Sequence, residues 1–336
     1  MPMSASLTTS LFTQSERLES ESYLDYMVRL FENKKEYSLT CDDIAALLNE
    51  QTGNSYTECT YRKYYAAFND GRLYERGASV ERPARTILCL SDFHYPYALP
   101  VETFYSYREP DVLLLNGDIV DMQGISKFPK AYRVSPMEEM VGGRQYMIDL
   151  ISYLSPRRVV INKGNHEVRF GTYLSRTIDG ELKDLMPETA LDLIVNDGFH
   201  HYDKRGRTKI WYPPLKEVFE DIEIEYTGEW WCKIGSAIFA HPLAYSSGIL
   251  KTSEKAANHF LRVDPDFDTL VLAHTHKLGL YREGNVTLYE QGCCCQSGKM
   301  NYADGKLTMP QQRGFLYLCQ DKGGKLMFDQ TKLVTL

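Results

Sequence analysis

The chain has no hydrophobic run long enough to cross a membrane as a helix. Its 336 residues contain no stretch of about 18 consecutive apolar residues, and the polar start at Met1–Ser6 lacks the apolar core of a signal peptide. We therefore expect a cytoplasmic protein that makes no use of a membrane. Hydrophobic residues make up 43% of the chain and charged residues 25%, which suits one large or two ordinary globular domains.

The chain also lacks an excess of positive charge. Its formal net charge is −7, which argues against the strongly basic body of a dedicated nucleic-acid binder, so any contact with a polyanion has to be local. The densest basic and aromatic patch covers residues 199–209. It supplies three candidate substrate contacts, for which a surface or structural role is the alternative: His200, His201 and Arg205.

Paired C-x-x-C spacing is missing among the eight cysteines, although three of them are adjacent, Cys293-Cys294-Cys295. Without export, we expect these thiols to be reduced. Metal sites with thiolate ligands usually contain pairs of cysteines that are separated in the sequence. A metal site at this run of three is therefore the weaker interpretation. We interpret the three as packing residues, because free cysteine behaves as a small hydrophobe.

Three short helices are predicted in the first quarter of the chain. Apolar residues recur at helical spacing over residues 22–31. Thr40 and Asp43 suit a capping box at the start of a second helix, and a third helix is predicted over residues 57–68. A short helix, a glycine-containing turn and a further helix match the helix-turn-helix layout.

These helices define a small domain in front of the rest of the chain. We predict a flexible tail over residues 1–20, the helical domain over residues 21–75 and a linker over residues 76–85. We give equal weight to two functions for this domain. One is contact with DNA, and the other is docking on the main domain or on a second subunit. DNA contact is not favoured because Arg62 and Lys63 provide little positive charge for it.

After the linker, the sequence changes to apolar runs that end in polar residues. Such continuous runs are typical of strands covered on both faces, and they occur at residues 86–90, 112–116, 159–161, 236–240 and 269–273. Helices are predicted over residues 137–154 and 252–263, and a polar insert over residues 168–226. We predict an α/β catalytic domain over residues 86–336, with its ligands at the carboxyl ends of the strands.

The polar residues that follow these runs are the kinds that hold hard divalent metals, which favour carboxylate, amide and imidazole ligands. Asp118 has two carboxylate oxygens beside the small Gly117, so it can bridge two ions. Ions about 3.5 to 4 Å apart can clamp a phosphate and lower the pKa of a bridging water toward about 7. The sequence therefore predicts a two-metal site for phosphate-ester chemistry, with a bridging hydroxide as the attacking group.

The order of these motifs resembles the signature of calcineurin-like metallophosphoesterases. The resemblance covers about residues 86–318, and its motifs are Asp92-x-His94, Gly117-Asp118-x-x-Asp121, Gly164-Asn165-His166-Glu167, His241 and His274-x-His276. It implies a β-sandwich of two mixed sheets flanked by helices. Four further segments are similar to the phage and prophage branch of the family, which tends to carry a small helical domain in front: residues 124–128, 164–169, 289–295 and 311–315.

The resemblance also implies a role for each motif residue. The first metal would be bound by Asp92, His94, Asp118 and His276. The second would be bound by Asp118, Asn165, His241 and His274. His166 would act near the leaving group as a general acid or a transition-state stabiliser, and Asp121 would orient its imidazole. The expected cofactors are two divalent ions, Mn²⁺ first, with Fe, Zn²⁺, Co²⁺ or Ni²⁺ as alternatives.

Arg169 stands close behind the Gly-Asn-His-Glu motif, and two interpretations of it stay open. It either reaches a substrate phosphate, which suits bidentate recognition by arginine, or pairs with Glu167. Two arginines that are usual in the protein phosphatases of this family are absent, since Met122-Gln123 follows Asp121 and Lys163 precedes Gly164. Their absence weakens the interpretation as a protein phosphatase.

We therefore expect a two-metal phosphodiesterase or nuclease that acts on nucleic acid or nucleotides. The first alternative is a phosphomonoesterase for a small metabolite or a phosphoprotein. The second is a nucleic-acid-binding protein whose metal site is vestigial.

Overall fold

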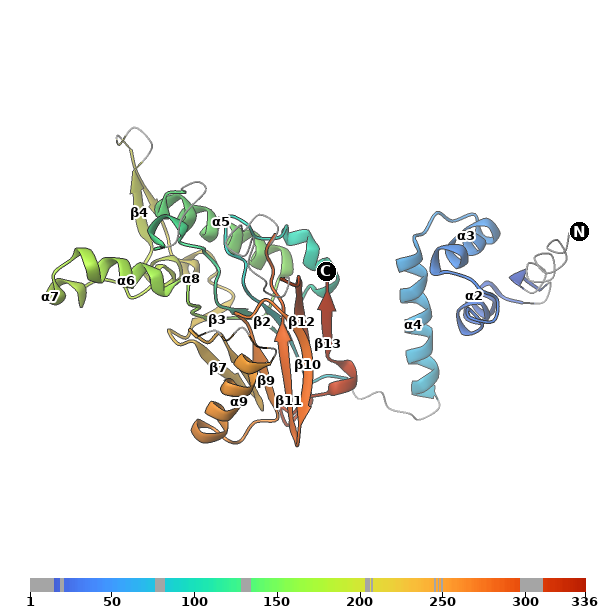
Figure 1. Cartoon of the computed structure of the whole chain (residues 1–336). Helices are drawn as coiled ribbons and strands as arrows, with labels where there is room; N and C mark the ends of the chain where they lie inside the picture. The colour runs from blue at the N-terminus through green and yellow to red at the C-terminus, as the bar shows by residue number, and fades with distance from the viewer. Residues whose placement is uncertain are drawn as a thin grey trace, which may run out of the picture. The chain divides into compact units, whose positions relative to one another are not determined.

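The computed structural model describes residues 15–18, 21–75, 82–127, 134–202, 206, 208–244, 246, 248, 250–296 and 311–336. The chain divides into two compact units, Met1–Glu81 and Arg82–Leu336 (Figure 1). No helix within the described ranges is long and apolar enough to span a membrane.

The smaller unit is built on three helices, α2 (Tyr23–Glu32), α3 (Cys41–Thr52) and α4 (Glu58–Glu75). The predicted capping box begins α3, because the Thr40 side chain accepts the N–H of Asp43 and the Asp43 carboxylate accepts the N–H of Thr40. The buried side chains of the unit include Tyr26, Leu30, Ile44 and Leu48. All three predicted helices are present, and α4 continues past residue 68 through a polar stretch that has no apolar periodicity.

Two features of the smaller unit differ from expectation. Part of the predicted flexible tail is anchored on α2, since the Tyr26 hydroxyl donates to the Ser15 carbonyl at 2.7 Å. The basic side chain of Arg62 pairs with Glu58 at 2.9 Å, so the footprint available for DNA is smaller than a count of basic residues suggests. Residues 76–81 of the predicted linker lie outside the described residues.

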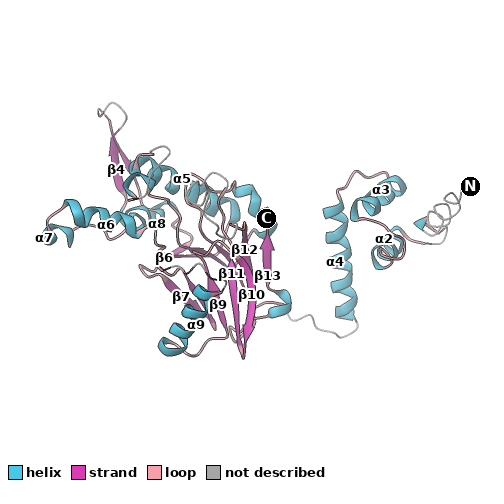
Figure 2. Cartoon of the chain, viewed as in Figure 1, coloured by secondary structure: helices cyan, strands magenta, loops and turns pink. Residues whose placement is uncertain are grey.

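The larger unit is a sandwich of two mixed sheets with helices beside them (Figure 2). The six-stranded sheet has the order β13 (Lys332–Thr335), β12 (Gly314–Gln320), β1 (Arg85–Leu90), β2 (Val112–Asn116), β3 (Arg158–Asn162) and β6 (Glu223–Tyr226). The five-stranded sheet has the order β10 (Leu278–Glu283), β11 (Val286–Gln291), β9 (Thr269–Leu272), β8 (Ala237–Ala240) and β7 (Trp231–Ile234). Each sheet combines parallel and antiparallel pairs. The predicted fold class is therefore confirmed.

Alternate residues of β1 serve two different cores, because successive side chains of a strand point to opposite faces. Leu88 and Leu90 belong to the core that includes α5 (Pro136–Leu154). Ile87 and Cys89 belong to the core between the sheets, together with residues of β8, β9 and β11. A third core packs α9 (Lys251–Val263) on the five-stranded sheet. Burial on both faces explains why these strands appear in the sequence as continuous apolar runs.

The predicted insert over residues 168–226 is wrong at its end. Its last four residues form β6, which pairs in parallel with β3 and so belongs to the main sheet. Ile194 and Val195 also lie in the main core. β6 was missed because it is a short edge strand that carries Glu223 and Glu225 instead of an apolar run.

The rest of this segment forms small elements. They are α6 (Val168–Thr177), α7 (Gly180–Lys183), a π-helical turn (Asp192–Asp197), a hairpin of β4 (Phe199–Tyr202) with β5 (Lys209–Tyr212), and α8 (Leu215–Val218). The first of them, α6, directly follows the Gly-Asn-His-Glu motif and therefore lies at the edge of the candidate site.

Candidate metal centre

The site is assembled by loops that follow five strands. Strands β1, β2 and β3 are parallel to one another, as are β8 and β9, so within each set the carboxyl ends lie at one edge of the sheet. Backbone bonds continue between the loops beyond β1 and β2, since the N–H of Asp92 donates to the Gly117 carbonyl at 3.1 Å and that of His94 to the Asp118 carbonyl at 2.9 Å. The motif residues are thereby held in register.

Asp118 lies at the middle of the cluster and is buried. Its Oδ2 atom is 3.3 Å from His241 Nε2 and 3.7 Å from His94 Nε2. Its Oδ1 atom accepts the backbone N–H of His166 at 2.8 Å. One carboxylate thus connects the loops that follow β1, β3 and β8.

The other predicted ligands form two groups around Asp118. In the first, His276 Nε2 lies 3.0 Å from Asp92 Oδ1 and 3.1 Å from His94 Nε2. In the second, Asn165 Oδ1 lies 3.2 Å from His241 Nε2, and ligand atoms of Asp118, His241 and His274 lie within 4.8 Å of one another. The structure therefore brings all seven predicted ligands together.

This donor set fits two divalent cations. Buried carboxylates are costly unless positive charge offsets them, and here two of them, Asp92 and Asp118, are enclosed by imidazoles and an amide oxygen. Oxygen and nitrogen donors of this kind are the usual ligands of first-row divalent metals.

The carboxylates and imidazoles shift one another's ionisation strongly. Burial alone would lower the pKa of His241, but the Asp118 carboxylate outweighs it and raises that pKa to about 10. Likewise, Asp92 overcomes burial and raises the pKa of His276 to about 9. Burial and then the charge of His241 lower the pKa of His274 to about 4. Without metal, His241 and His276 are therefore protonated at pH 7.

We expect divalent metals to bind this site more tightly as the pH rises from 7 to 9. His241 and His276 must each lose a proton before they can ligate, and the raised pKa values place that loss above neutral pH. Affinity should increase by up to about tenfold per pH unit for each proton released. Calorimetric Mn²⁺ titrations in two buffers of different ionisation enthalpy count those protons directly. Equal affinities at pH 7 and 9 with no proton release would refute this expectation.

His166 is held by Asp121, as the motif predicts for a catalytic imidazole. Its Nδ1 atom lies 2.7 Å from Asp121 Oδ1, and its Nε2 atom lies 3.7 Å from Asp118 Oδ2. Arg169 contacts both residues, since its guanidinium lies 2.8 Å from His166 Nε2 and donates to the Asp121 carbonyl at 2.6 Å. With Nδ1–H directed at a carboxylate, Nε2 is the acceptor of a neutral imidazole, and here the Arg169 guanidinium donates to it.

Glu167 has a structural role that the sequence did not reveal. Its buried carboxylate accepts backbone N–H groups of Asp118 (2.9 Å), Ile119 (2.7 Å), Val120 (3.3 Å) and Gly164 (2.8 Å). It therefore ties the loop after β2 to the loop after β3. The alternative that Glu167 pairs with Arg169 is wrong, because the carboxylate is occupied by these backbone groups.

Glu167→Gln is expected to destabilise the metal-free protein by about 1 to 3 kcal/mol, because an amide NH₂ would face buried N–H donors. Burial is the main cause of the raised pKa of Glu167, and repulsion by the Asp118 carboxylate is the next one. The substitution removes this repulsion, which favours the variant. It still leaves backbone N–H donors without an acceptor. Thermal unfolding in the presence of a chelator measures the difference. The control is Glu188→Gln at an exposed position, which should change stability by less than about 0.5 kcal/mol.

The loops approach so closely that two glycines have no room for a side chain. A Cβ on Gly164 would lie 2.2 Å from Asp118 Oδ1 and 2.4 Å from its backbone nitrogen, and one on Gly117 would lie 2.6 Å from His241 Nδ1. Gly117 also has a φ of +81°. Five of the predicted ligands also have a left-handed backbone conformation, which is unfavourable for residues other than glycine. They are Asp92, His94, Asp118, His274 and His276.

A second buried carboxylate supports the loop after Asp121. Glu139 of α5 accepts the N–H of Gln123 at 3.1 Å, and burial, followed by the charge of Asp121, raises its pKa to about 8. A glutamate inside an amphipathic helix pattern gives no sign of this contact, so the sequence offered no signal for it.

The predicted substrate contacts outside the motifs are not part of the metal cluster. His200 and His201 lie on β4, where His200 packs on Trp211 with ring centroids 4.7 Å apart. Neither histidine belongs to the groups of clustered metal-binding side chains among the described residues. Arg205 lies outside the described residues.

A cavity of about 140 Å³ opens beside the predicted metal ligand Asn165. The cavity is lined by residues of α6 and by residues of the segment that follows the Gly-Asp-x-x-Asp motif. Its lining includes Asn165, Lys127, Arg169, Thr172, Tyr173 and Arg176. Three of its lining side chains are cationic, and the cavity shares Asn165 with the candidate centre.

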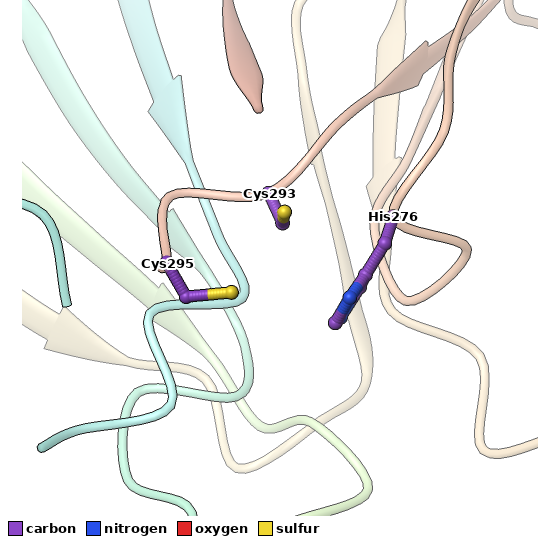
Figure 3. A group of neighbouring side chains, drawn as sticks. All are labelled: His276, Cys293 and Cys295. Atoms are coloured by element: carbon purple, nitrogen blue, oxygen red, sulfur yellow. The ribbon is translucent and has the colours of Figure 1, made fainter. Parts of the chain in front are cut away.

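The cysteine run is buried, as expected for packing residues, but its members lie in different surroundings. Cys294 belongs to the core that includes α5, whereas Cys293 and Cys295 form a small cluster with Tyr97. The thiols of Cys293 and Cys295 lie within 4.8 Å of each other and of a ring nitrogen of His276 (Figure 3).

Two family models match the chain, one in each unit. The model described as calcineurin-like phosphoesterase matches residues 85–278, and the YonJ N-terminal domain matches residues 12–79. A curated relative, the SPbeta prophage-derived uncharacterized protein YonJ of Bacillus subtilis (strain 168), is 35% identical over 68 residues, which are 20% of this chain. The chain thus spans only 17% of the length of that relative.

Several solved structures are similar to this chain. Wild-type Vps29 of Entamoeba histolytica complexed with zinc is 15% identical, with a TM-score of 0.35 and coverage of 74% of this chain and 96% of that one. An archaeal phosphodiesterase is 15% identical, with a TM-score of 0.34 and coverage of 75% and 99%. A metallophosphoesterase of Sphaerobacter thermophilus is 15% identical, with a TM-score of 0.32 and coverage of 70% and 82%.

Proposed function

The chain belongs to the calcineurin-like phosphoesterase family, whose model matches more than half of it, and we propose that it hydrolyses phosphodiester bonds in nucleic acid or nucleotides. The family assignment made from five ordered motifs is confirmed, and the match to a prophage protein agrees with the phage-type branch. The larger unit is accordingly a metal-dependent phosphoesterase. Its substrate and its preferred ions are the parts that we propose.

The observation that carries the phosphodiester proposal is the cationic cavity beside Asn165. Arg169, Tyr173 and Arg176 are spaced by three or four residues on α6, so they lie on one face of the helix and line the cavity together. A monoester needs only the metal centre, whereas a diester carries a second substituent that has to lie next to it. Arginine suits a neighbouring phosphate, and an exposed tyrosine ring suits a base.

The chain's own residues would share the reaction as follows. Asp92, His94, Asp118, Asn165, His241, His274 and His276 would hold two divalent ions, and Mn²⁺ is the first one to test. Bound ions of this kind polarise a phosphoryl oxygen and lower the pKa of water. His166 would donate a proton to the leaving oxygen or stabilise its charge, and Asp121 would keep the imidazole in the required orientation.

The test compares a diester with a monoester. With Mn²⁺ present, bis(p-nitrophenyl) phosphate should be hydrolysed faster than p-nitrophenyl phosphate, and single-stranded DNA, RNA and dinucleotides should be surveyed beside them. Rapid monoester cleavage without diester turnover would replace the proposal by a phosphomonoesterase. Purified protein that binds no divalent ion and cleaves neither substrate would favour the vestigial site.

Arg176→Ala provides a sharper version of this test. It should raise KM for a dinucleotide or oligonucleotide and leave turnover of bis(p-nitrophenyl) phosphate nearly unchanged, because only the longer substrate reaches the far end of the cavity. Arg157→Ala is the matched control, since that arginine is exposed and pairs with Asp111. Equal effects of Arg176→Ala on both substrates would show that the cavity does not bind the longer substrate.

A further inference from the structure

The loop that follows β11 is fixed beside the candidate metal centre by backbone hydrogen bonds. The N–H of Cys293 donates to the Gln312 carbonyl at 3.0 Å, while the N–H of Gln312 donates to the His276 carbonyl at 2.8 Å. The N–H of Cys294 donates to the Ser91 carbonyl at 2.9 Å, next to Asp92. Gln312 therefore connects the cysteine loop directly to the loop that carries His276.

The spacing of the cysteines places two thiols on one side of this loop. Cys293 and Cys295 each form an isolated β-bridge, with Arg313 and Ala98 respectively, so the segment is extended and residues two apart face the same way. Cys294 faces the opposite way into the main core. Figure 3 shows the two thiols on one loop and His276 on the facing one.

We propose that His276, Cys293 and Cys295 bind a thiophilic divalent ion such as Zn²⁺ or Co²⁺. Their ligand atoms lie within 4.8 Å of one another, and all three side chains are buried. Metal–nitrogen and metal–sulfur bonds of about 2.0 and 2.3 Å place the ligand atoms of a tetrahedral ion about 3.5 to 3.8 Å apart, so side chains need to close by only about 1 Å. The two sulfur atoms would thus lie next to the oxygen and nitrogen ligands of the candidate metal centre.

This site has a consequence for metal choice. His276 belongs to two groups of potential ligands, one with Asp92 and His94 and the other with Cys293 and Cys295. Thiolates select zinc-like ions, whereas oxygen donors suit Mn²⁺ and Mg²⁺. A chelator concentration that removes Mn²⁺ from the protein should therefore leave Zn²⁺ or Co²⁺ bound.

The test is the absorption spectrum of full-length, metal-free protein titrated with Co²⁺. Wild type should develop a near-ultraviolet thiolate-to-cobalt charge-transfer band, which imidazole and carboxylate ligands do not produce. Cys293→Ala and Cys295→Ala should weaken or lose the band. Cys294→Ala is the matched control and should keep it, because this neighbour points into the core. A cobalt-saturated wild type without the band, or a band that survives both substitutions, overturns the proposal.

A second measurement needs no substitution and covers the case in which a variant fails to fold. In zinc-loaded wild type, X-ray absorption at the zinc edge should show sulfur at about 2.3 Å, and this measurement does not require solvent access to the buried thiols. A zinc environment of nitrogen and oxygen alone contradicts the site. Because neither readout uses catalysis, a thiolate band in a protein without diesterase activity would refute only the proposed substrate, and diesterase activity without the band would refute only the thiol site.

Discussion

Asp118→Asn is expected to lower phosphodiester hydrolysis by about 10³-fold or more and to remove at least one divalent ion. Asp118 is the one predicted ligand common to both metals, and its Oδ2 atom faces His241 and His94 at 3.3 and 3.7 Å. Metal ions contribute several kcal/mol of charge stabilisation, and each 1.4 kcal/mol changes the rate about tenfold. An asparagine keeps the oxygen that accepts the His166 N–H but loses the negative charge.

The experiment pairs metal analysis of the purified variant with its rate on bis(p-nitrophenyl) phosphate. Circular dichroism establishes that the variant is folded. Asp149→Asn on α5 serves as the control, because Asp149 is exposed and its carboxylate accepts a hydrogen bond from the Gln145 side chain. Two tightly bound ions together with a nearly normal rate would contradict the bridging role.

His166→Gln should reduce the rate by about 10² to 10⁴ while both ions stay bound, since general acid catalysis contributes an effect of that size. The imidazole is aligned by Asp121 at 2.7 Å and lies next to the cluster. A proton donor matters more when the leaving group is a poor one. The loss should therefore be larger for a nucleoside leaving group than for p-nitrophenolate.

That difference between leaving groups separates an acid from a structural residue, which would affect both substrates equally. Metal analysis supplies a further check, because His166 also lies within 4.8 Å of ligand atoms of His94 and Asp118. Loss of an ion in His166→Gln would show that this histidine is a ligand. Asp121→Asn should show the same dependence on the leaving group with a smaller loss.

The strands that could be predicted from the sequence are those buried on both faces. Strands β1, β2, β3, β8 and β9 appear as apolar runs, and the helix after β2 has a regular apolar face. Strands β6 and β7 were missed because four-residue strands at sheet edges bury little and alternate with charged or polar side chains. The end of α4 was missed for a similar reason, since its last turns are polar.

The sequence predicted that the seven candidate ligands would lie close together, but it did not predict the residues that support them. The candidate ligands are metal-binding residue types placed after strands, so motif order was enough to single them out. The contacts of Glu167 with the loop after β2 join residues 47 to 49 positions apart, and no local pattern encodes them. The sequence does not mark the shared face of Cys293 and Cys295, because three adjacent cysteines look the same whether or not the segment is extended.

The tight approach of Gly117 and Gly164 limits how this enzyme can diversify. A Cβ at either position would lie less than 3 Å from Asp118 or His241, so even alanine would push apart the loops that meet at the Asp118 carboxylate. In a saturation library, we expect nearly every substitution at both glycines to be inactive, whatever its size or charge. Thr172, Tyr173 and Arg176 on the exposed side of α6 carry no such restriction. New substrate ranges should therefore arise along that helix, while the centre itself stays unchanged.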